Sequence, residues 1–257
     1  MRDYLKTCER AARAGGEQLV QWRGRFQVHS KGPSDWVTEA DFASQDAIRK
    51  IVEADFPDHD FLGEEDTEIR QTGSRFVWHV DPLDGTTNYV HGAPPYCVSV
   101  ALAEEGEVIA AAVYDPVLDE CFTAERGQGA RLNGEPIAVS NATNLENSLV
   151  TASFPPLVDP KSEEIQAFLR ILQSAGSMRR TGSAALNLCY VAAGRFDAFW
   201  AVTIKSWDVA AGVLLVREAG GIVTAPSGSS FVLDQPKFAC AASEKLHREL
   251  ISGLALS

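Results

Sequence analysis

The 257-residue sequence has no long apolar run, and this absence excludes several classes of protein. A helix that spans a bilayer needs about 20 consecutive apolar residues, and no stretch of the chain approaches that length. The N-terminal segment alternates charged and small apolar residues at helical spacing, whereas a secretory signal peptide has a continuous apolar core. We therefore expect no membrane segment, and we expect the N-terminus to be part of the fold.

Cysteine is scarce, and its distribution excludes a disulfide framework. The cysteines are odd in number, far apart, and form neither a CxxC pair nor a Cys/His zinc pattern. The five are Cys8, Cys97, Cys121, Cys189 and Cys240. This pattern is typical of buried, reduced thiols, so we expect a cytoplasmic protein.

Basic residues are too few for a nucleic-acid partner. The chain has 23 Lys and Arg against 35 Asp and Glu, a formal net charge of −12. Affinity for nucleic acids comes mainly from clustered Lys and Arg that neutralise phosphates, so we expect no such partner. If the substrate is itself an anion, the acidic balance requires bound divalent cations to attract it.

The apolar pattern divides the chain into two halves, 1–145 and 146–257. In the first half it predicts helices at 3–22 and after Thr38, then strands at 76–80, 97–102, 108–114 and 120–123. In the second it predicts strands at 148–152, 196–201, 222–224 and 238–241, and helices at 163–172, 184–193, 209–219 and after Ser243. Because helices and strands come in blocks, we expect an α+β fold of stacked layers.

The segment 78–88, WHVDPLDGTTN, carries the richest chemistry. An apolar strand runs into Asp81 and Asp84, with Pro82 fixing the backbone between them and Gly85 permitting a sharp turn. Both carboxylates can then face one point, and Leu83 between them offers only its backbone carbonyl. Such hard oxygen ligands suit Mg²⁺, which takes a few carboxylates and completes its shell with water and phosphate.

The residues after these acids favour an adjacent anion site. Gly85, Thr86 and Thr87 present backbone N–H groups and hydroxyls where a helix starts, an arrangement that binds phosphate. The alternative is that Asp-Pro and Asp-Gly are simply turn formers. Two acids, a proline, a glycine and two threonines directly after a strand argue against this alternative.

Three further acids have structural as well as functional interpretations. Glu64 follows the apolar pair at 61–62 and can be a strand-end ligand or part of a solvated acidic loop. Asp208 stands in the first turn of an apolar helix, where an N-cap is the alternative. Asp41 lies three residues after Thr38, as in a capping box.

Taken together, these segments resemble the signatures of the inositol monophosphatase family. The resemblance rests on DWVTEAD at 35–41, GEED at 63–66, WHVDPLDGTTN at 78–88, WDVAAG at 207–212 and EAGG at 218–221. It covers essentially the whole chain, in the expected order and with similar spacing. It implies a layered αβαβα sandwich related to fructose-1,6-bisphosphatase, usually a homodimer, in which both halves build one active site.

The resemblance also implies a set of site residues. The metal positions, for two or three Mg²⁺ ions, are Glu64, Asp81, the carbonyl of Leu83, Asp84 and Asp208. The catalytic positions are Asp41, Glu64 and Thr86, with Thr86 orienting a water that the metal ions activate. The substrate positions are Asp84, Gly85, Thr86, Thr87, Arg179, Gly182, Ser183, Ala184 and Asp208. The implied reaction is hydrolysis of an inositol monophosphate or a similar small polyol or sugar phosphate, sensitive to lithium.

Two positions leave the substrate and the loop chemistry open. Inositol-specific relatives carry a Glu seven residues before the Trp-Asp aspartate, but this chain has Ala201 there. The alternatives are a histidinol-phosphate, 3′-phosphoadenosine 5′-phosphate or fructose-1,6-bisphosphate phosphatase, or a regulatory binding protein without catalysis. Lys31 lies in a segment like the family's mobile loop, where it either approaches the metals or is a solvated lysine.

Overall fold

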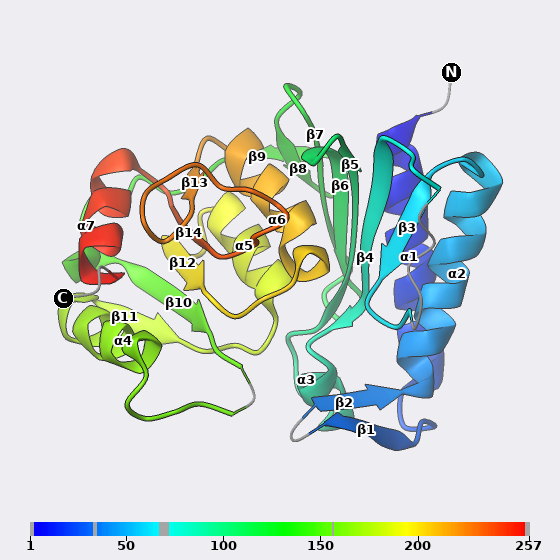
Figure 1. Cartoon of the computed structure of the whole chain (residues 1–257), viewed down its shortest axis with the longest axis horizontal. Coiled ribbons are helices and arrows are strands. Elements are labelled where there is room, and N and C mark those ends of the chain that lie inside the picture. Colours follow the sequence, from blue (N-terminus) through cyan, green and yellow to red (C-terminus); the bar gives the residue numbers. More distant parts are fainter. Residues whose placement is uncertain (1–2, 33–34, 67–71, 156, 255–257) are drawn as a thin grey trace.

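The computed structural model describes residues 3–32, 35–66, 72–155 and 157–254, and the structural statements below concern these residues (Figure 1). None of the described helices is long and apolar enough to cross a membrane. All five cysteines are buried and free, as predicted. Burial raises the pKa of Cys97 and Cys189 well above its usual range, so these thiols stay protonated and behave as small apolar side chains.

A seven-stranded sheet comes from the first half of the chain. Its strands, in spatial order, are β3 (Asp60–Gly63), β4 (Phe76–Asp84), β5 (Cys97–Glu104), β6 (Glu107–Asp115), β7 (Glu120–Glu125), β8 (Ala130–Leu132) and β9 (Glu135–Ile137). Neighbours are antiparallel except β3, which runs parallel to β4. The predicted meander is therefore confirmed, although β8 and β9 were not predicted.

Two helices cover the outer face of this sheet (Figure 1). Helix α1 (Tyr4–Trp22) begins after Asp3, whose side chain accepts from the backbone of Lys6. Helix α2 (Glu39–Asp55) begins after Thr38 in the predicted capping box. Between them, β1 (Val28–Gly32) and β2 (Asp35–Thr38) form a small antiparallel ribbon that the sequence did not predict.

The second sheet belongs to the second half of the chain and has a mixed topology. Its strands, in spatial order, are β11 (Ser177–Arg179), β10 (Leu149–Ser153), β12 (Ala198–Ala201), β14 (Phe238–Ala241) and β13 (Ile222–Thr224). Strand β10 runs parallel to β11 and β12, whereas β14 is antiparallel to both of its neighbours. All of these strands except β11 were predicted. Strand β11 was missed because three residues at a sheet edge, none of them buried, leave almost no periodic signal.

Helices α5 (Ala184–Ala192) and α6 (Ser206–Glu218) lie between the two sheets, and α4 (Glu163–Ser174) and α7 (Glu244–Leu254) cover the far side (Figure 1). A central helix must be apolar all round, and α6 has eight consecutive buried residues, from Val209 to Val216. At Gly212 the two central helices touch, since a Cβ there would lie 2.4 Å from the Cβ of Leu188.

Three hydrophobic cores separate the layers. One lies between α1, α2 and the first sheet, the second surrounds α5 and α6 between the sheets, and the third lies between the second sheet and α4 and α7. The order helix, sheet, helix, sheet, helix is the predicted αβαβα sandwich. The central strands of both sheets are therefore covered on both faces, and a polar site is expected where strands and helices end.

Candidate active site

The two acids of β4 face one point because the strand contains a bulge. Asp81 pairs with Ser99 and Asp84 pairs with Cys97, so three residue steps on β4 match two on β5. In a regular strand, side chains three residues apart point to opposite faces, and one extra residue reverses this. Pro82 lies in the bulge, where its carbonyl accepts a hydrogen bond from the Ser44 hydroxyl at 2.8 Å.

Two further acids reach the same point from different elements. Glu64 directly follows β3, and because β3 is parallel to β4, with Gly63 opposite Val80, it arrives beside Asp81. Asp208 lies in the first turn of α6 and also accepts from the backbone N–H of Lys205 at 2.9 Å. Carboxylate oxygens of Glu64, Asp81 and Asp208 all lie within 4.8 Å of one another.

Asp84 is held at this cluster by the start of α5. Its Oδ2 accepts hydrogen bonds from the Ser183 hydroxyl at 2.7 Å and from the Ala185 N–H at 2.6 Å. Ser183 is also the N-cap of α5, since its hydroxyl accepts from the Leu186 N–H at 3.2 Å. A helix N-terminus favours negative charge, so the second half of the chain fixes an acid of the first half.

The buried acids of the cluster repel one another, and a bound cation would relieve this repulsion. Burial raises the pKa of Asp81 well above its usual range, and the charges of Glu64, Asp84 and Asp208 raise it further. Burial likewise raises the pKa of Asp208, and it raises the pKa of Asp84 to about 6 despite the hydrogen bond from Ser183. Oxygens on opposite sides of an octahedral Mg²⁺ are about 4.2 Å apart, so the observed convergence suits a divalent cation.

Asp41 and Thr86 lie next to the cluster. The Thr86 hydroxyl donates to the Leu83 carbonyl at 3.0 Å and lies 3.4 Å from Oδ1 of Asp41. The other oxygen of Asp41 accepts from the backbone N–H and the hydroxyl of Thr38, at 2.8 and 2.6 Å. Burial raises the pKa of Asp41 to about 6, and the hydrogen bonds from Thr38 only partly offset this. Asp41 is thus both a helix cap and a neighbour of Thr86.

Lys31 contacts the acids in this structure. Its ammonium nitrogen lies 3.2 Å from Oε1 of Glu64 and 2.6 Å from Oε1 of Glu65. Burial would lower the pKa of Lys31, but the attraction of Glu64 and the hydrogen bond to Glu65 outweigh it and raise the pKa. Burial also raises the pKa of Glu65 to about 7. The contact argues against a freely solvated lysine.

A cavity of about 540 Å³ opens above the cluster. Its floor consists of Glu64, Asp81, Leu83, Asp84, Asp208 and the segment 85–88. The other residues that line it are Trp36, Ser153, Phe154, Arg180, Thr181, Gly182, Ala184, Thr203 and Ile204. The predicted metal, phosphate and leaving-group segments therefore share one cavity, to which both halves of the chain contribute.

Three predicted positions lie elsewhere than expected. Arg179 does not line the cavity, since it donates to the Ser177 hydroxyl and the Met178 carbonyl, whereas the next residue, Arg180, does. Ser183 is fully buried and its hydroxyl is bonded to Asp84, so it faces the acid and not the open cavity. Ala201 is also fully buried at the end of β12, and the cavity wall is built by Thr203 and Ile204 instead.

Sequence reasoning missed the residues that shape the leaving-group side. Phe154 follows β10, and the guanidinium of Arg180 lies 5.8 Å from the centre of its ring. Ile204 and Thr203 stand in the loop before α6. The only signal available was the position of 153–154 and 203–204 at the carboxyl ends of β10 and β12, parallel strands whose ends meet at one edge.

The layered fold is that of a class of phosphatases. The model of the inositol monophosphatase family matches residues 1–255, so the chain belongs to this family.

The chain is similar over most of its length to relatives that carry two different protein names. It is 41% identical over 243 residues to the Nus factor SuhB of Pseudomonas aeruginosa, covering 91% of this chain and 90% of that protein. It is 42% identical over 229 residues to the inositol-1-monophosphatase of Rhizobium meliloti, covering 88% and 86%. The crystal structure of the extragenic suppressor protein SuhB from Bartonella henselae superposes with a TM-score of 0.91 at 37% identity, covering 97% of each chain.

Proposed function

We propose that this protein hydrolyses the phosphate monoester of a small polyol or sugar, with two or three Mg²⁺ ions held by the acid cluster. The observation that carries the proposal is the convergence of Glu64, Asp81 and Asp208 within 4.8 Å at the floor of a cavity. Asp84 and the Leu83 carbonyl complete the proposed ligand set. When bound, Mg²⁺ lowers the pKa of water and neutralises the charge of a phosphoryl group.

The chain's own residues position the reactants. The Thr86 hydroxyl has one proton, which the Leu83 carbonyl at 3.0 Å and Oδ1 of Asp41 at 3.4 Å compete for, so its oxygen keeps lone pairs that can accept from the attacking water. The N–H groups of Gly85, Thr86 and Thr87 hold phosphate oxygens. Lys31 adds positive charge beside Glu64, which attracts the anionic substrate into an acidic site.

On the leaving-group side, the proposed site is permissive. Ala201 has no group that could bind a hydroxyl, and it is buried, so Phe154, Thr203, Ile204 and Arg180 meet the alcohol. A charged hydrogen bond contributes about 1.5–3 kcal/mol, so its absence weakens discrimination by about one to two decades. We expect kcat/KM for myo-inositol 1-phosphate to be at most about tenfold above that for glycerol 2-phosphate.

Phosphate release from a panel of monoesters, with and without Mg²⁺, tests this function. The panel includes myo-inositol 1-phosphate, glycerol 2-phosphate, histidinol phosphate and 3′-phosphoadenosine 5′-phosphate. Asp84→Asn should nearly abolish turnover while the protein stays folded, because it removes one charge from the ligand set. Asp60→Asn is the matched control, since Asp60 is a buried acid of the same sheet that bonds Thr72 and does not join the cluster. Full turnover in Asp84→Asn, or in chelator, would contradict the metal mechanism.

Two further properties of the family belong to the proposal. We expect a homodimer, which light scattering after gel filtration measures directly. We also expect inhibition by millimolar or lower lithium, because a small hard cation can compete with Mg²⁺ for carboxylate oxygens. Equal responses to LiCl and KCl at matched ionic strength would count against the lithium site.

A regulatory role is a second candidate, favoured by the similarity to a protein named as a Nus factor. The Asp84→Asn variant separates the two, because it removes a proposed metal ligand and leaves the outer surface unchanged. If the variant replaces the native protein in cells without a defect, regulation is the main role. If the defect equals that of a deletion, catalysis is the main role.

A further inference from the structure

Arg180 brings a positive charge to an acidic cavity. It is the only Lys or Arg among the described residues that line the active-site cavity, where the other charged side chains are the four acids of the cluster. Those acids are the proposed metal ligands, so bound cations would neutralise their charge. The side chain of Arg180 is exposed and makes no ion pair or hydrogen bond with the described residues. Its charge is therefore available to a ligand.

The loop that carries Arg180 is anchored to the floor of this cavity. Asn88 donates to the Thr181 carbonyl at 2.9 Å and to the Pro95 carbonyl at 2.7 Å. The next residue, Gly182, has a φ of +93°, and a Cβ there would lie 2.9 Å from the side chain of Asn88. The backbone next to Arg180 is thus held beside the segment 85–88, which is proposed to bind the phosphate.

The guanidinium of Arg180 lies over an aromatic ring on the leaving-group side. It is 5.8 Å from the ring centre of Phe154, and Phe154 packs edge-on against Phe168 of α4, with 5.3 Å between the ring centres. Thr203 and Ile204, which line the cavity after the end of β12, carry no charge. An anionic group on the alcohol would therefore meet a cation here and no acidic side chain.

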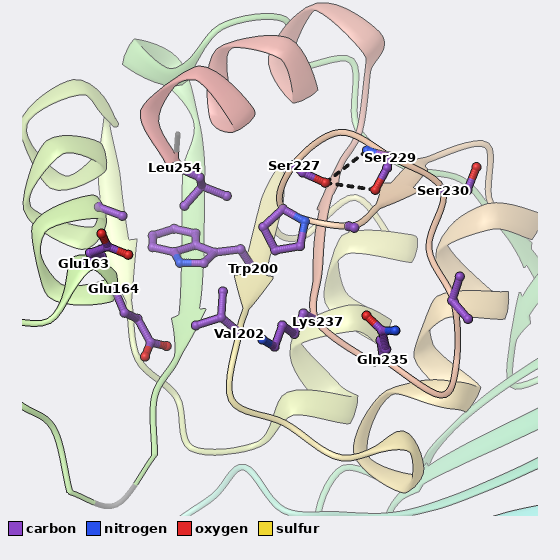
Figure 2. A pocket seen from close by; sticks show the side chains of 14 residues that line it. Glu163, Glu164, Trp200, Val202, Ser227, Ser229, Ser230, Gln235, Lys237 and Leu254 are labelled. Carbon is purple, nitrogen blue, oxygen red and sulfur yellow. Dashed lines mark hydrogen bonds between the residues drawn. The ribbon is translucent and has the colours of Figure 1, made fainter. Parts of the chain in front are cut away.

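The larger cavity of the molecule offers no equivalent site for an anion. It has about 900 Å³, lies on the far side of the second sheet and shares no lining residue with the active-site cavity (Figure 2). Lys237 lines it together with two acids, Glu163 and Glu164. These acids belong to no metal-binding group of the described residues, so their charge would repel an anion.

We propose that Arg180 makes the enzyme select phosphate monoesters whose alcohol carries a carboxylate, that is, phosphorylated hydroxy acids and sugar acids. A guanidinium binds a carboxylate through two parallel hydrogen bonds, and the two single charges cancel. A second phosphate would carry a charge of about −1.5 to −2 at pH 7, more than one arginine offsets. This selectivity rests on the proposed function, and among neutral alcohols the site stays permissive because Ala201 is buried and apolar.

Two matched pairs of esters test the selectivity, and the members of each pair differ only by a carboxylate in place of a hydroxymethyl group. The pairs are 3-phosphoglycerate with glycerol 3-phosphate, and 6-phosphogluconate with sorbitol 6-phosphate. We expect kcat/KM for the acid to exceed that for the alcohol at least tenfold in the pair whose length matches the span from the phosphate to Arg180. Calorimetric titration with Ca²⁺, which takes the same oxygen ligands as Mg²⁺, measures the ratio of the two dissociation constants without relying on turnover.

Three variants assign the preference to one side chain. Arg180→Gln should lower the acid-to-alcohol ratio to below about threefold, and Arg180→Glu should reverse it, because an acid then faces the carboxylate. Arg179→Gln is the matched control, since Arg179 is the adjacent exposed arginine, bonds to Ser177 and Met178, and does not line the cavity. Its acid-to-alcohol ratio should stay within about twofold of the native ratio. Thermal unfolding checks that all three variants are folded.

The outcomes separate the selectivity from the proposed function. Ratios near one in both native pairs, or a preference that Arg180→Gln leaves unchanged, would overturn the role of Arg180 even if the neutral esters are hydrolysed. An equal fall of the ratio in Arg179→Gln would overturn it too, because the preference would then come from general surface charge. If no ester is hydrolysed in Mg²⁺, the phosphatase function fails, and the calorimetric ratios alone decide whether Arg180 binds the carboxylate.

Discussion

At the scale of single residues, structural and functional interpretations of an acid are often both correct. The sequence offered helix capping and catalysis as alternatives for Asp41, yet one oxygen caps α2 and the other faces Thr86. Asp208 likewise accepts from the backbone of Lys205 and converges with Glu64 and Asp81. A carboxylate has two oxygens, so a helix cap can hold one rigidly while the other serves a ligand.

Thr86 gives the sharpest single-residue prediction. Thr86→Val keeps the shape of the side chain but deletes its donor and acceptor, so kcat should fall by roughly 10²-fold if the hydroxyl positions the attacking water. Steady-state kinetics with saturating Mg²⁺ measure the change. Thr86→Ser restores the hydroxyl and should recover most of kcat. Equal losses in both variants would instead assign the residue to packing, and a loss in KM alone would assign it to binding.

At the scale of elements, the sequence predicted what local pattern specifies. The helices and the longer strands follow apolar periodicity, and the capping box at Thr38 appears as predicted. Strands β1, β2, β8, β9 and β11 were missed because they have only three to five residues each, too few to show a clear alternation. The β4 bulge was also not predicted, since it depends on the register against β5.

The start of α5 provides a matched pair of helix caps. Ser183→Ala and Ser162→Ala each delete an N-cap hydroxyl, which should cost about 1 kcal/mol of unfolding free energy. Only Ser183 also donates to Asp84. We therefore expect Ser183→Ala alone to raise the Mg²⁺ concentration for half-maximal activity, by about tenfold. Denaturant unfolding and Mg²⁺ titration separate the effects, and identical Mg²⁺ dependence in the two variants would contradict this role.

The turn before α3 (Thr86–Val90) provides a second pair. Gly85 and Gly92 both have positive φ, +96° and +66°, so alanine at either position costs about 1 kcal/mol of strain. A Cβ at Gly85 would lie 2.9 Å from the Pro95 carbonyl oxygen, whereas at Gly92 it would meet nothing within 4 Å. Gly85→Ala should therefore lower the free energy of unfolding by about 1–3 kcal/mol more than Gly92→Ala does, as measured by denaturant unfolding. Equal losses of unfolding free energy in the two variants would show that the backbone around Pro95 shifts to make room for the added Cβ.

At the scale of the whole molecule, the site exists only where layers meet. The motif at 78–88 identified Asp81 and Asp84 from sequence, because its chemistry is local. The bond from Ser183 to Asp84 spans 99 residues, and the wall formed by Phe154 and Ile204 depends on how β10 and β12 end at one edge. Such contacts between distant segments leave no spacing signal, which is why Arg179 was predicted and Arg180 lines the cavity.

This convergence of charge predicts how stability depends on pH and Mg²⁺. Burial and mutual repulsion raise the folded-state pKa of Asp81, Asp84 and Asp208 above the unfolded value near 3.8. The folded state then binds more protons than the unfolded state. Without metal, the contribution of these acids to the free energy of unfolding is therefore full at low pH, and it is lost as pH rises through the folded pKa, about 6 for Asp84. Mg²⁺ competes with these protons, so its stabilising effect should increase from pH 5 to 8.

Asp84→Asn isolates this linkage. In chelator at pH 7.5 the variant should unfold at a higher temperature than the native protein, because a repelling charge is gone. At pH 5 the difference in unfolding temperature between the two proteins should be smaller, since Asp84 is then largely protonated in the folded native protein. Burial lowers the pKa of His79 to about 4, so His79 destabilises both proteins equally in acid and cancels in their difference.

The Mg²⁺-induced rise in Tm should shrink in the variant, whereas Asp60→Asn should keep it in full. A native protein that is more stable than Asp84→Asn in chelator at pH 7.5 would mean that the bonds from Ser183 and Ala185 outweigh the repulsion, and that the cluster does not need a cation to form.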